Sequence, residues 1–127
     1  MMVADTALLI DFLRGRDPGR ARIKLEIASG RLGTTAINAF ELLSGARSAG
    51  EREKVATLLA ALTILPFEEQ AAVRAADAHL HLEGQGAGIG MADYLIAGVC
   101  LNRGGTLLTR NLAHFQRAPN LNIGGHH

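Results

Sequence analysis

The chain has 127 residues, of which 48% are hydrophobic and 4% aromatic, and a formal net charge of +1. This length and composition predict one domain with an aliphatic core, over residues 1–123, and the charge alone does not indicate a nucleic-acid binder. The single cysteine, Cys100, excludes an internal disulfide and a cysteine-based zinc site. No apolar run is long enough to span a membrane, so we expect a cytoplasmic protein without a membrane partner. Residues 124–127 are typical of a purification-tag remnant and enter no metal-binding argument.

Short apolar segments alternate with helical patterns along the chain. In order, the pattern predicts a strand over 2–4, helices over 6–13 and 17–30, a strand over 32–36, helices over 37–47 and 51–62, a strand over 63–65, helices over 68–83 and 91–103, a strand over 106–109 and a short strand over 121–123. Asp17 and Pro18 are expected to open the second helix as its N-cap and first residue. We therefore expect an α/β three-layer sandwich, with a central, mostly parallel sheet of four or five strands and helices on both faces.

Three carboxylates stand alone in long, otherwise uncharged segments. Asp5, Glu41 and Asp93 are each the only charged residue of an apolar stretch that we expect to be buried. A buried carboxylate is costly unless it finds hydrogen bonds, a cation or a metal. Ligands of α/β sheets bind at the carboxyl ends of the strands, and Asp5 stands at such an end. Three converging carboxylates would form an oxygen-rich site for a hard divalent cation, of the kind that hydrolyses phosphodiesters.

A purely structural interpretation must be weighed for each acid, and two of the three have one. Asp5 could cap the helix over 6–13, and Asp93 could interact favourably with the N-terminus of its own helix. Glu41 lies in mid-helix and has no Lys or Arg within one turn, so it has no such explanation. His114, beside an aromatic residue, is expected to pack or cap locally.

Several segments, in this order, resemble the motifs of PIN-domain ribonucleases. They are residues 3–13 around Asp5, 35–46 around Glu41, 89–97 around Asp93, 107–115 around Asn111 and the strand over 121–123. Size and spacing resemble most the VapC-type toxins of bacterial and archaeal toxin–antitoxin pairs. The resemblance implies a Mg²⁺- or Mn²⁺-dependent endoribonuclease that uses a metal-activated water. It also implies a small antitoxin partner, which inserts a segment into the active-site cleft, and a homodimer.

The resemblance assigns roles to individual residues. Asp5, Glu41 and Asp93 match the metal-binding, catalytic acids. Asn111 is assigned to the catalytic set as well and stands where a fourth acid is frequent, since an amide can still bind a metal-bound water or a phosphate. No Asp or Glu follows Asp93, so the site is less negative than in relatives with four acids. Thr6 and Thr109 match hydroxyl positions that orient the acids. Arg110 adjoins the site and is expected to contact a phosphate of the RNA.

Two other functions remain open from the residues. The missing fourth acid favours a catalytically silent PIN-like module that binds RNA or protein. A receiver-type phosphotransfer domain is disfavoured, because no Lys follows Lys54. A basic stretch between residues 14 and 24 is interpreted as a solvated helix face, with a phosphate-contacting surface as the alternative. It contains Arg14, Arg16, Arg20, Arg22 and Lys24.

Overall fold

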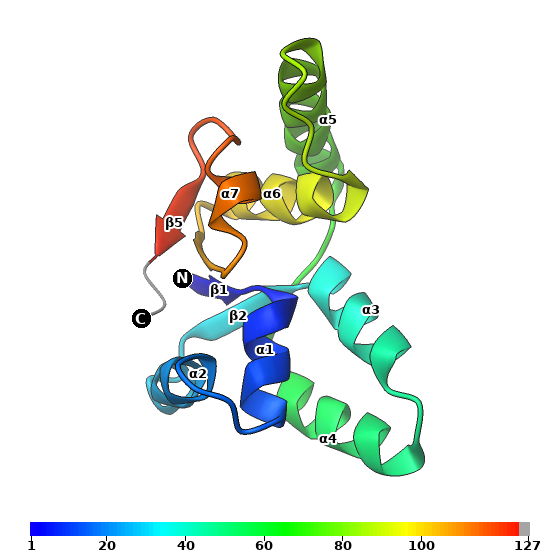
Figure 1. Ribbon diagram of the computed structural model, residues 1–127, viewed down its shortest axis with the longest axis vertical. Coiled ribbons are helices and arrows are strands. Elements are labelled where there is room, and N and C mark those ends of the chain that lie inside the picture. The colour runs from blue at the N-terminus through cyan, green and yellow to red at the C-terminus, as the bar shows by residue number, and fades with distance from the viewer. Residues whose placement is uncertain (125–127) are drawn as a thin grey trace.

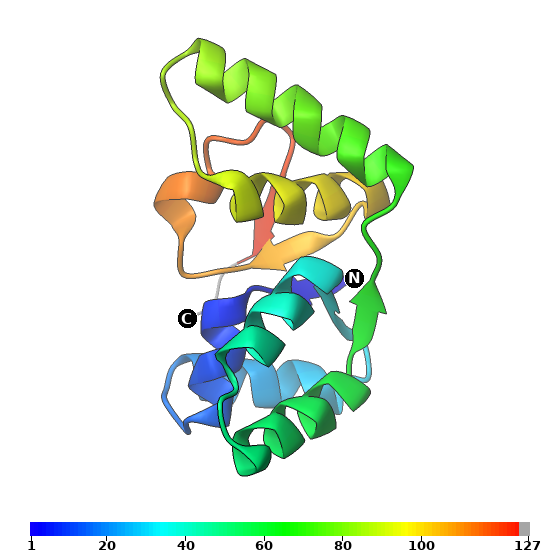
Figure 2. The same ribbon diagram turned by 90° about the vertical axis from the view of Figure 1, so that its right-hand side faces the viewer.

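A computed structural model describes residues 1–124 and contains a five-stranded parallel sheet between two layers of helices (Figures 1 and 2). The strands are β1 (Met2–Ala4), β2 (Leu32–Thr35), β3 (Thr63–Leu65), β4 (Thr106–Leu108) and β5 (Asn122–Gly124), in the order β3-β2-β1-β4-β5. All four pairings are parallel. The predicted fold class is therefore confirmed. Gly124, expected to belong to a tag, pairs with Leu108 in β5, and 125–127 lie outside the described residues.

The helices match the predicted pattern, with small shifts at their ends. They are α1 (Thr6–Leu13), α2 (Gly19–Ala28), α3 (Ala36–Gly45), α4 (Ala49–Ala60), α5 (Glu69–Gly84), α6 (Met91–Arg103) and α7 (Leu112–Phe115). The expected N-cap of α2 was wrong, because the cap is Pro18 and carries no side-chain hydrogen bond. Asp17 nevertheless satisfies an early amide of α2, since its Oδ1 accepts the Ala21 N–H at 3.0 Å. Helix α7, which follows β4, was not predicted.

Side chains alternate between the two faces of the sheet and so divide the core in two. Ala4 and Leu108 pack with α1, α2, α3 and α4. Val3 and Leu107 pack with residues of α5, α6 and α7 on the other face. This alternation follows from the two-residue period of a strand. In Figure 2 the two helical layers lie above and below the strands.

The strand order reverses between β1 and β4, at the centre of the sheet. From β1 the chain builds outward through β2 and β3, and it then returns to the other side of β1 with β4 and β5. The segments that follow β1 and β4 therefore diverge at the carboxyl ends of these two strands, and this is where ligands bind in open α/β sheets. Asp5 and Thr109 are the first residues after these two strands. Among residues 1–124, no helix is both long and apolar enough to cross a membrane.

Candidate active site

Asp5 is buried at the carboxyl end of β1 and also caps α1. Its Oδ1 accepts hydrogen bonds from the Thr6 N–H at 2.9 Å and from Nδ2 of Asn38 at 3.1 Å. Its Oδ2 accepts one from the Thr109 hydroxyl at 2.7 Å. The structural interpretation of Asp5 as a helix cap is therefore correct. Because the contacting groups are neutral donors, they orient the carboxylate but leave its charge uncompensated.

Asn38 organises this buried network and was not foreseen from the sequence. It is fully buried, and its Oδ1 accepts from the Thr35 N–H at 3.3 Å and the Thr35 hydroxyl at 2.7 Å. The Asn38 N–H in turn donates to the Thr35 hydroxyl, which completes a capping box at the start of α3. This leaves Nδ2 to donate to Asp5 and, at 2.9 Å, to the Thr6 hydroxyl. A Thr followed three residues later by an amide at a helix start was the available signal.

Glu41 lies one turn after Asn38 on α3 and joins the same network. The Thr6 hydroxyl donates to Oε1 of Glu41 at 2.7 Å. Thr6 thereby connects the two acids, because its N–H donates to Asp5. Glu41 and Asp93 are only partly buried, so the expectation of three buried acids is correct for Asp5 alone. The side chains of both half-exposed acids can be reached by solvent.

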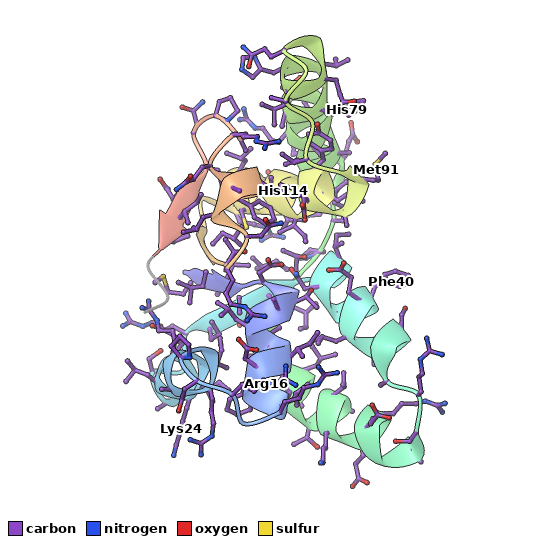
Figure 3. All side chains as sticks on the ribbon, viewed as in Figure 1. Arg16, Lys24, Phe40, His79, Met91 and His114 are labelled. Atoms are coloured by element: carbon purple, nitrogen blue, oxygen red, sulfur yellow. The ribbon has the colours of Figure 1, made fainter. Side chains whose placement is uncertain are left out.

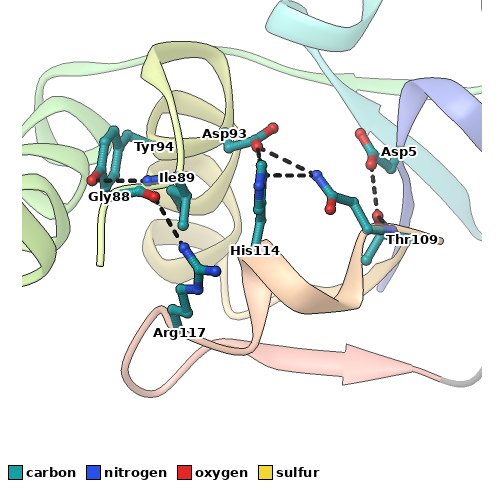
Figure 4. A network of polar contacts seen from close by, with 9 residues as sticks. Asp5, Gly88, Ile89, Asp93, Tyr94, Thr109, His114 and Arg117 are labelled. Atoms are coloured by element: carbon teal, nitrogen blue, oxygen red, sulfur yellow. Dashed lines mark hydrogen bonds and ion pairs between the residues drawn. The ribbon is translucent and has the colours of Figure 1, made fainter. Parts of the chain in front are cut away.

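Asp93 stands in the first turn of α6, opposite the short helix α7 (Figure 4). The preceding loop turns into α6 at Gly90, whose φ of +100° favours glycine. Oδ2 of Asp93 lies 2.9 Å from Nδ1 of His114 and 3.5 Å from Nδ2 of Asn111. His114 therefore belongs to the site, and the expectation that it only packs or caps locally was wrong.

Asn111 and His114 compete for the same oxygen of Asp93. Nδ2 of Asn111 is also 3.0 Å from Nδ1 of His114. A carboxylate only accepts, so Nδ1 must carry a hydrogen to bond Asp93, and it cannot then accept from Asn111. The Asn111 backbone is fixed separately, because its N–H donates to the Thr109 hydroxyl at 2.9 Å. The amide of Asn111 is thus the adaptable member of this group.

The electrostatics of the site are unfavourable without a cation. Burial raises the pKa of Asp5 above its usual value, and the charge of Asp93 raises it further, while hydrogen bonds from Thr109, Thr6 and Asn38 act in the opposite direction. In the described part of the chain, neither Asp5 nor Glu41 forms an ion pair with Lys or Arg. Burial, followed by the charge of Asp5, also raises the pKa of the Cys100 thiol to about 12, so this cysteine is an inert core residue.

The donor chemistry suits a hard divalent cation. Carboxylate oxygens are the ligands that Mg²⁺ and Mn²⁺ prefer, and Mg²⁺ commonly keeps several waters while one or two carboxylates bind it. Over residues 1–124, no three His, Cys, Asp or Glu side chains form a compact metal-binding group. Asp5, Glu41 and Asp93 are thus an open set, which fits a hydrated ion better than a fully caged one.

Arg110 adjoins this site in the chain, whereas the basic stretch covers the end of α1 and most of α2. Arg110, which is flanked by Thr109 and Asn111, forms an ion pair with Asp11 of α1. Arg22 pairs with Glu26 within α2 at 3.0 Å, and the two side chains are only 21% and 16% exposed, so this pair does not belong to a fully solvated face. The other basic residues of the stretch are exposed: Arg14, Arg16, Arg20 and Lys24.

Comparison with known proteins identifies the family. Residues 2–121 match the PIN domain. The chain belongs to the PIN-domain family. It is similar to ribonuclease VapC10 of Mycobacterium tuberculosis, with 33% identity over 130 residues that cover 99% of this chain and 97% of that protein. It is also similar to the tRNA(fMet)-specific endonuclease VapC of Salmonella typhimurium, with 28% identity over 110 residues, 84% of this chain and 83% of that one.

A solved structure supports the same assignment. The crystal structure of DNA-bound VapBC from Salmonella typhimurium matches this PIN domain with a TM-score of 0.85 and 26% identity. The match covers 99% of this chain and 98% of the other. The resemblance to PIN-domain ribonucleases of the VapC type, inferred from the sequence motifs, is therefore confirmed.

Proposed function

We propose that this PIN domain is the toxin of a toxin–antitoxin pair, an endoribonuclease that hydrolyses RNA phosphodiesters with a metal-activated water. The observation that carries the proposal is the uncompensated negative charge of the carboxylates at the carboxyl ends of β1 and β4, where the strand order reverses. Asp5 and Glu41 have no Lys or Arg partner among residues 1–124, and Asp93 has only an imidazole. The name of VapC10 as a ribonuclease and its similarity over the whole chain support the same reaction.

In this proposal Asp5, Glu41 and Asp93 hold Mg²⁺ or Mn²⁺. When bound, the ion supplies an acidified water and neutralises charge on the phosphate. The protein's own part is to fix the carboxylates. Thr109 and Asn38 orient both oxygens of Asp5, and the Thr6 hydroxyl orients Glu41. Such prior orientation removes the need to reorganise these groups during the reaction.

Asn111 and Arg110 would act on the substrate rather than on the acids. Asn111 stands beside Asp93, where an amide adds no further negative charge. Its amide hydrogens can therefore donate to a phosphate oxygen that a fourth carboxylate would repel. Arg110 follows Thr109 directly and would place a permanent positive charge near the backbone of the RNA.

We infer an antitoxin that covers the acidic site. A groove of about 260 Å³ runs beside Glu41 between α1, α3 and α4, with Ile10 and Leu42 among its apolar lining residues. A small partner could lay an apolar segment there and present a basic side chain to the carboxylates. The match to a VapBC structure supports a partner of this kind.

A homodimer in the cytoplasm completes the proposal. Phe40 of α3 and Met91 of α6 are 67% and 68% exposed, and both lie at the same side of the molecule in Figure 3. A contiguous apolar patch at the surface marks contact with another protein, so the proposal requires that these two side chains belong to one interface. Light scattering of the purified protein, with Phe40→Ser as the comparison, would test whether a second copy covers them.

Metal-dependent cleavage is the direct test of the function. Purified protein should cut RNA with Mn²⁺ or Mg²⁺, lose the activity in EDTA and regain it when the ion is returned. Expression of the wild type alone should arrest growth, and the neighbouring antitoxin gene or Asp5→Ala should relieve the arrest. Undiminished cleavage in EDTA would refute the mechanism.

The alternative is a catalytically silent module, and the observation that favours it is Asn111 in the place of an acid. It predicts a harmless protein that binds RNA or protein but cuts no RNA even with Mn²⁺. The same cleavage and growth measurements therefore distinguish the two functions.

A further inference from the structure

An ion pair between a buried acid and an exposed arginine joins α1 to the turn after β4. Nη1 of Arg110 lies 3.4 Å from Oδ2 of Asp11, whose side chain is 4% exposed against 49% for Arg110. The acid is therefore inside the protein and the guanidinium is at its surface. A buried carboxylate is costly unless hydrogen bonds or a cation compensate it, and Arg110 is the one Lys or Arg that pairs with Asp11 in the described part of the chain. Asp11 consequently determines where this guanidinium lies.

The corner between α1 and α2 is built around this acid. A Cβ atom at Gly19, in the first turn of α2, would lie 2.6 Å from Oδ2 of Asp11. Contacts this short do not occur, so a glycine is required for Asp11 to keep its place. The backbone N–H of Arg16 also donates to the Asp11 carbonyl at 2.8 Å, which closes the turn after α1. The position of the carboxylate is thus fixed by both helices.

The ion pair leaves most of the guanidinium free. Arg110 makes no other ion pair or side-chain hydrogen bond within residues 1–124, although a guanidinium carries five N–H donors. Its neighbours in the chain both belong to the site, since the Thr109 hydroxyl contacts Asp5 and the Asn111 amide contacts Asp93. An unrestrained arginine here would be drawn to those carboxylates and would occupy them itself.

We propose that Asp11 is a positioning residue that holds Arg110 away from the catalytic acids and directs its free donors to an RNA phosphate beside the one that is cleaved. This inference rests on the proposed RNA substrate. An arginine suits the task, because its planar fork binds a phosphate through two hydrogen bonds at once. The buried acid acts only through Arg110, so its effect should vanish when Arg110 is absent.

RNA binding by four proteins tests the proposal: wild type, Arg110→Gln, Asp11→Asn and the double variant. Affinity for a fluorescent single-stranded oligonucleotide is measured in EDTA, where no metal-dependent cleavage occurs, over a range of salt concentrations. Arg110→Gln should weaken binding about tenfold and reduce the slope of log affinity against log salt by about 0.7, the value for one phosphate contact on a single strand. Asp11→Asn should weaken binding about threefold, and the double variant should equal Arg110→Gln.

A matched arginine serves as the control. Arg103 also pairs with an acid, Glu68. It lies at the end of α6, just before β4 begins, and so at the opposite end of the strands from the site. Arg103→Gln should leave both affinity and salt slope unchanged. Arg110→Lys should restore the salt slope but only part of the affinity, because it keeps the charge without the fork.

The outcomes separate this inference from the proposed function. A salt slope unchanged by Arg110→Gln would overturn the phosphate contact. Equal losses from Asp11→Asn with and without Arg110 would show that Asp11 only supports the fold, and would overturn its positioning role. If the wild type cuts no RNA with Mn²⁺ but the binding results are as expected, the nuclease fails and the Asp11–Arg110 inference stands.

Discussion

The two sides of the site hold their carboxylates in different ways. On the inner side, Asp5 is buried and receives hydrogen bonds from Thr6, Asn38 and Thr109. On the outer side, Asp93 is partly exposed and contacts Asn111 and His114. The inner partners are neutral and lie at the ends of β1 and β4 or in the first turn of α3, so they have little freedom. The outer partners come from the short helix α7 and its N-cap.

This difference assigns separate tasks to the two sides. The inner donors fix the geometry of Asp5 without cancelling its charge, so the attraction for a cation remains. The imidazole of His114 can cancel the charge of Asp93 only when it is protonated. The inner side is therefore the rigid half of the site, and we expect the outer side to adapt to the proposed metal and substrate.

Removal of the inner charge should give the largest effect. Asp5→Asn should lower RNA cleavage by about a thousandfold or more, because it deletes a ligand while most of the hydrogen-bonding shape is kept. Asp77→Asn, an exposed acid on α5, is the matched control and should retain full activity. Circular dichroism should show both variants folded. Cleavage by Asp5→Asn within tenfold of the wild type would contradict the central role of the inner side.

Loss of the inner scaffold should cost both stability and activity. Asn38→Ala should lower the free energy of unfolding by about 2–3 kcal/mol, because it leaves buried donors at Thr35 without their acceptor. Cleavage should fall as well, since Asp5 and Thr6 each lose a donor. Urea denaturation measures this free energy. As a control, Asn122→Ala at an exposed position should change the free energy of unfolding by less than about 0.5 kcal/mol. A stable but inactive Asn38→Ala would mean that the amide is not structural.

The sequence allowed much of this inner side to be predicted. Asp5 and Thr109 follow strands that could be recognised from apolar runs, and parallel strands bring their carboxyl ends together. Glu41 stood out because no basic residue lay near it. Asn38 was missed because it is an uncharged residue in an apolar segment and does not stand out there. Its role depends on hydrogen bonds to Asp5 and Thr6, which belong to another part of the chain.

The outer side and the ion pair were harder to foresee for a physical reason. Helix α7 is a single turn and is too short to show a hydrophobic periodicity. The spacing of residues therefore could not predict that the His114 side chain points toward Asp93. The sequence analysis did not single out Asp11, because its pairing with Arg110 joins residues at opposite ends of the chain. Contacts between distant segments depend on how the strands are ordered, which local patterns do not specify.

The outer side should tolerate change better than the inner side. His114→Gln should lower cleavage by about tenfold, because Asp93 loses one orienting contact but keeps Asn111. Stability should change by less than about 0.5 kcal/mol, since the pair is partly exposed and such pairs contribute little. His81→Gln on the exposed face of α5 is the control. A loss as large as that of Asp5→Asn would remove the distinction between the two sides.

The pH dependence of the free energy of unfolding should reveal the charge of the Asp5 carboxylate in the folded protein. Burial raises the pKa of Asp5, so in metal-free buffer the folded protein holds this proton more tightly than the unfolded chain does. When the folded state binds more protons, the free energy of unfolding falls as pH rises. The contribution of Asp5 should therefore be lost between the ordinary aspartate pKa of about 4 and its raised value.

Asp5→Asn isolates this contribution, because the other titrating groups are common to both proteins. The free energy of unfolding of the wild type minus that of Asp5→Asn should decrease as pH rises through this window and then level off. Mn²⁺ should reverse the trend in the wild type alone, since a cation binds the ionised carboxylate of the folded state. Urea denaturation at several pH values measures both. A difference that stays constant with pH would mean that Asp5 is fully compensated by its hydrogen bonds, and the inner side would then have no excess charge to offer a metal.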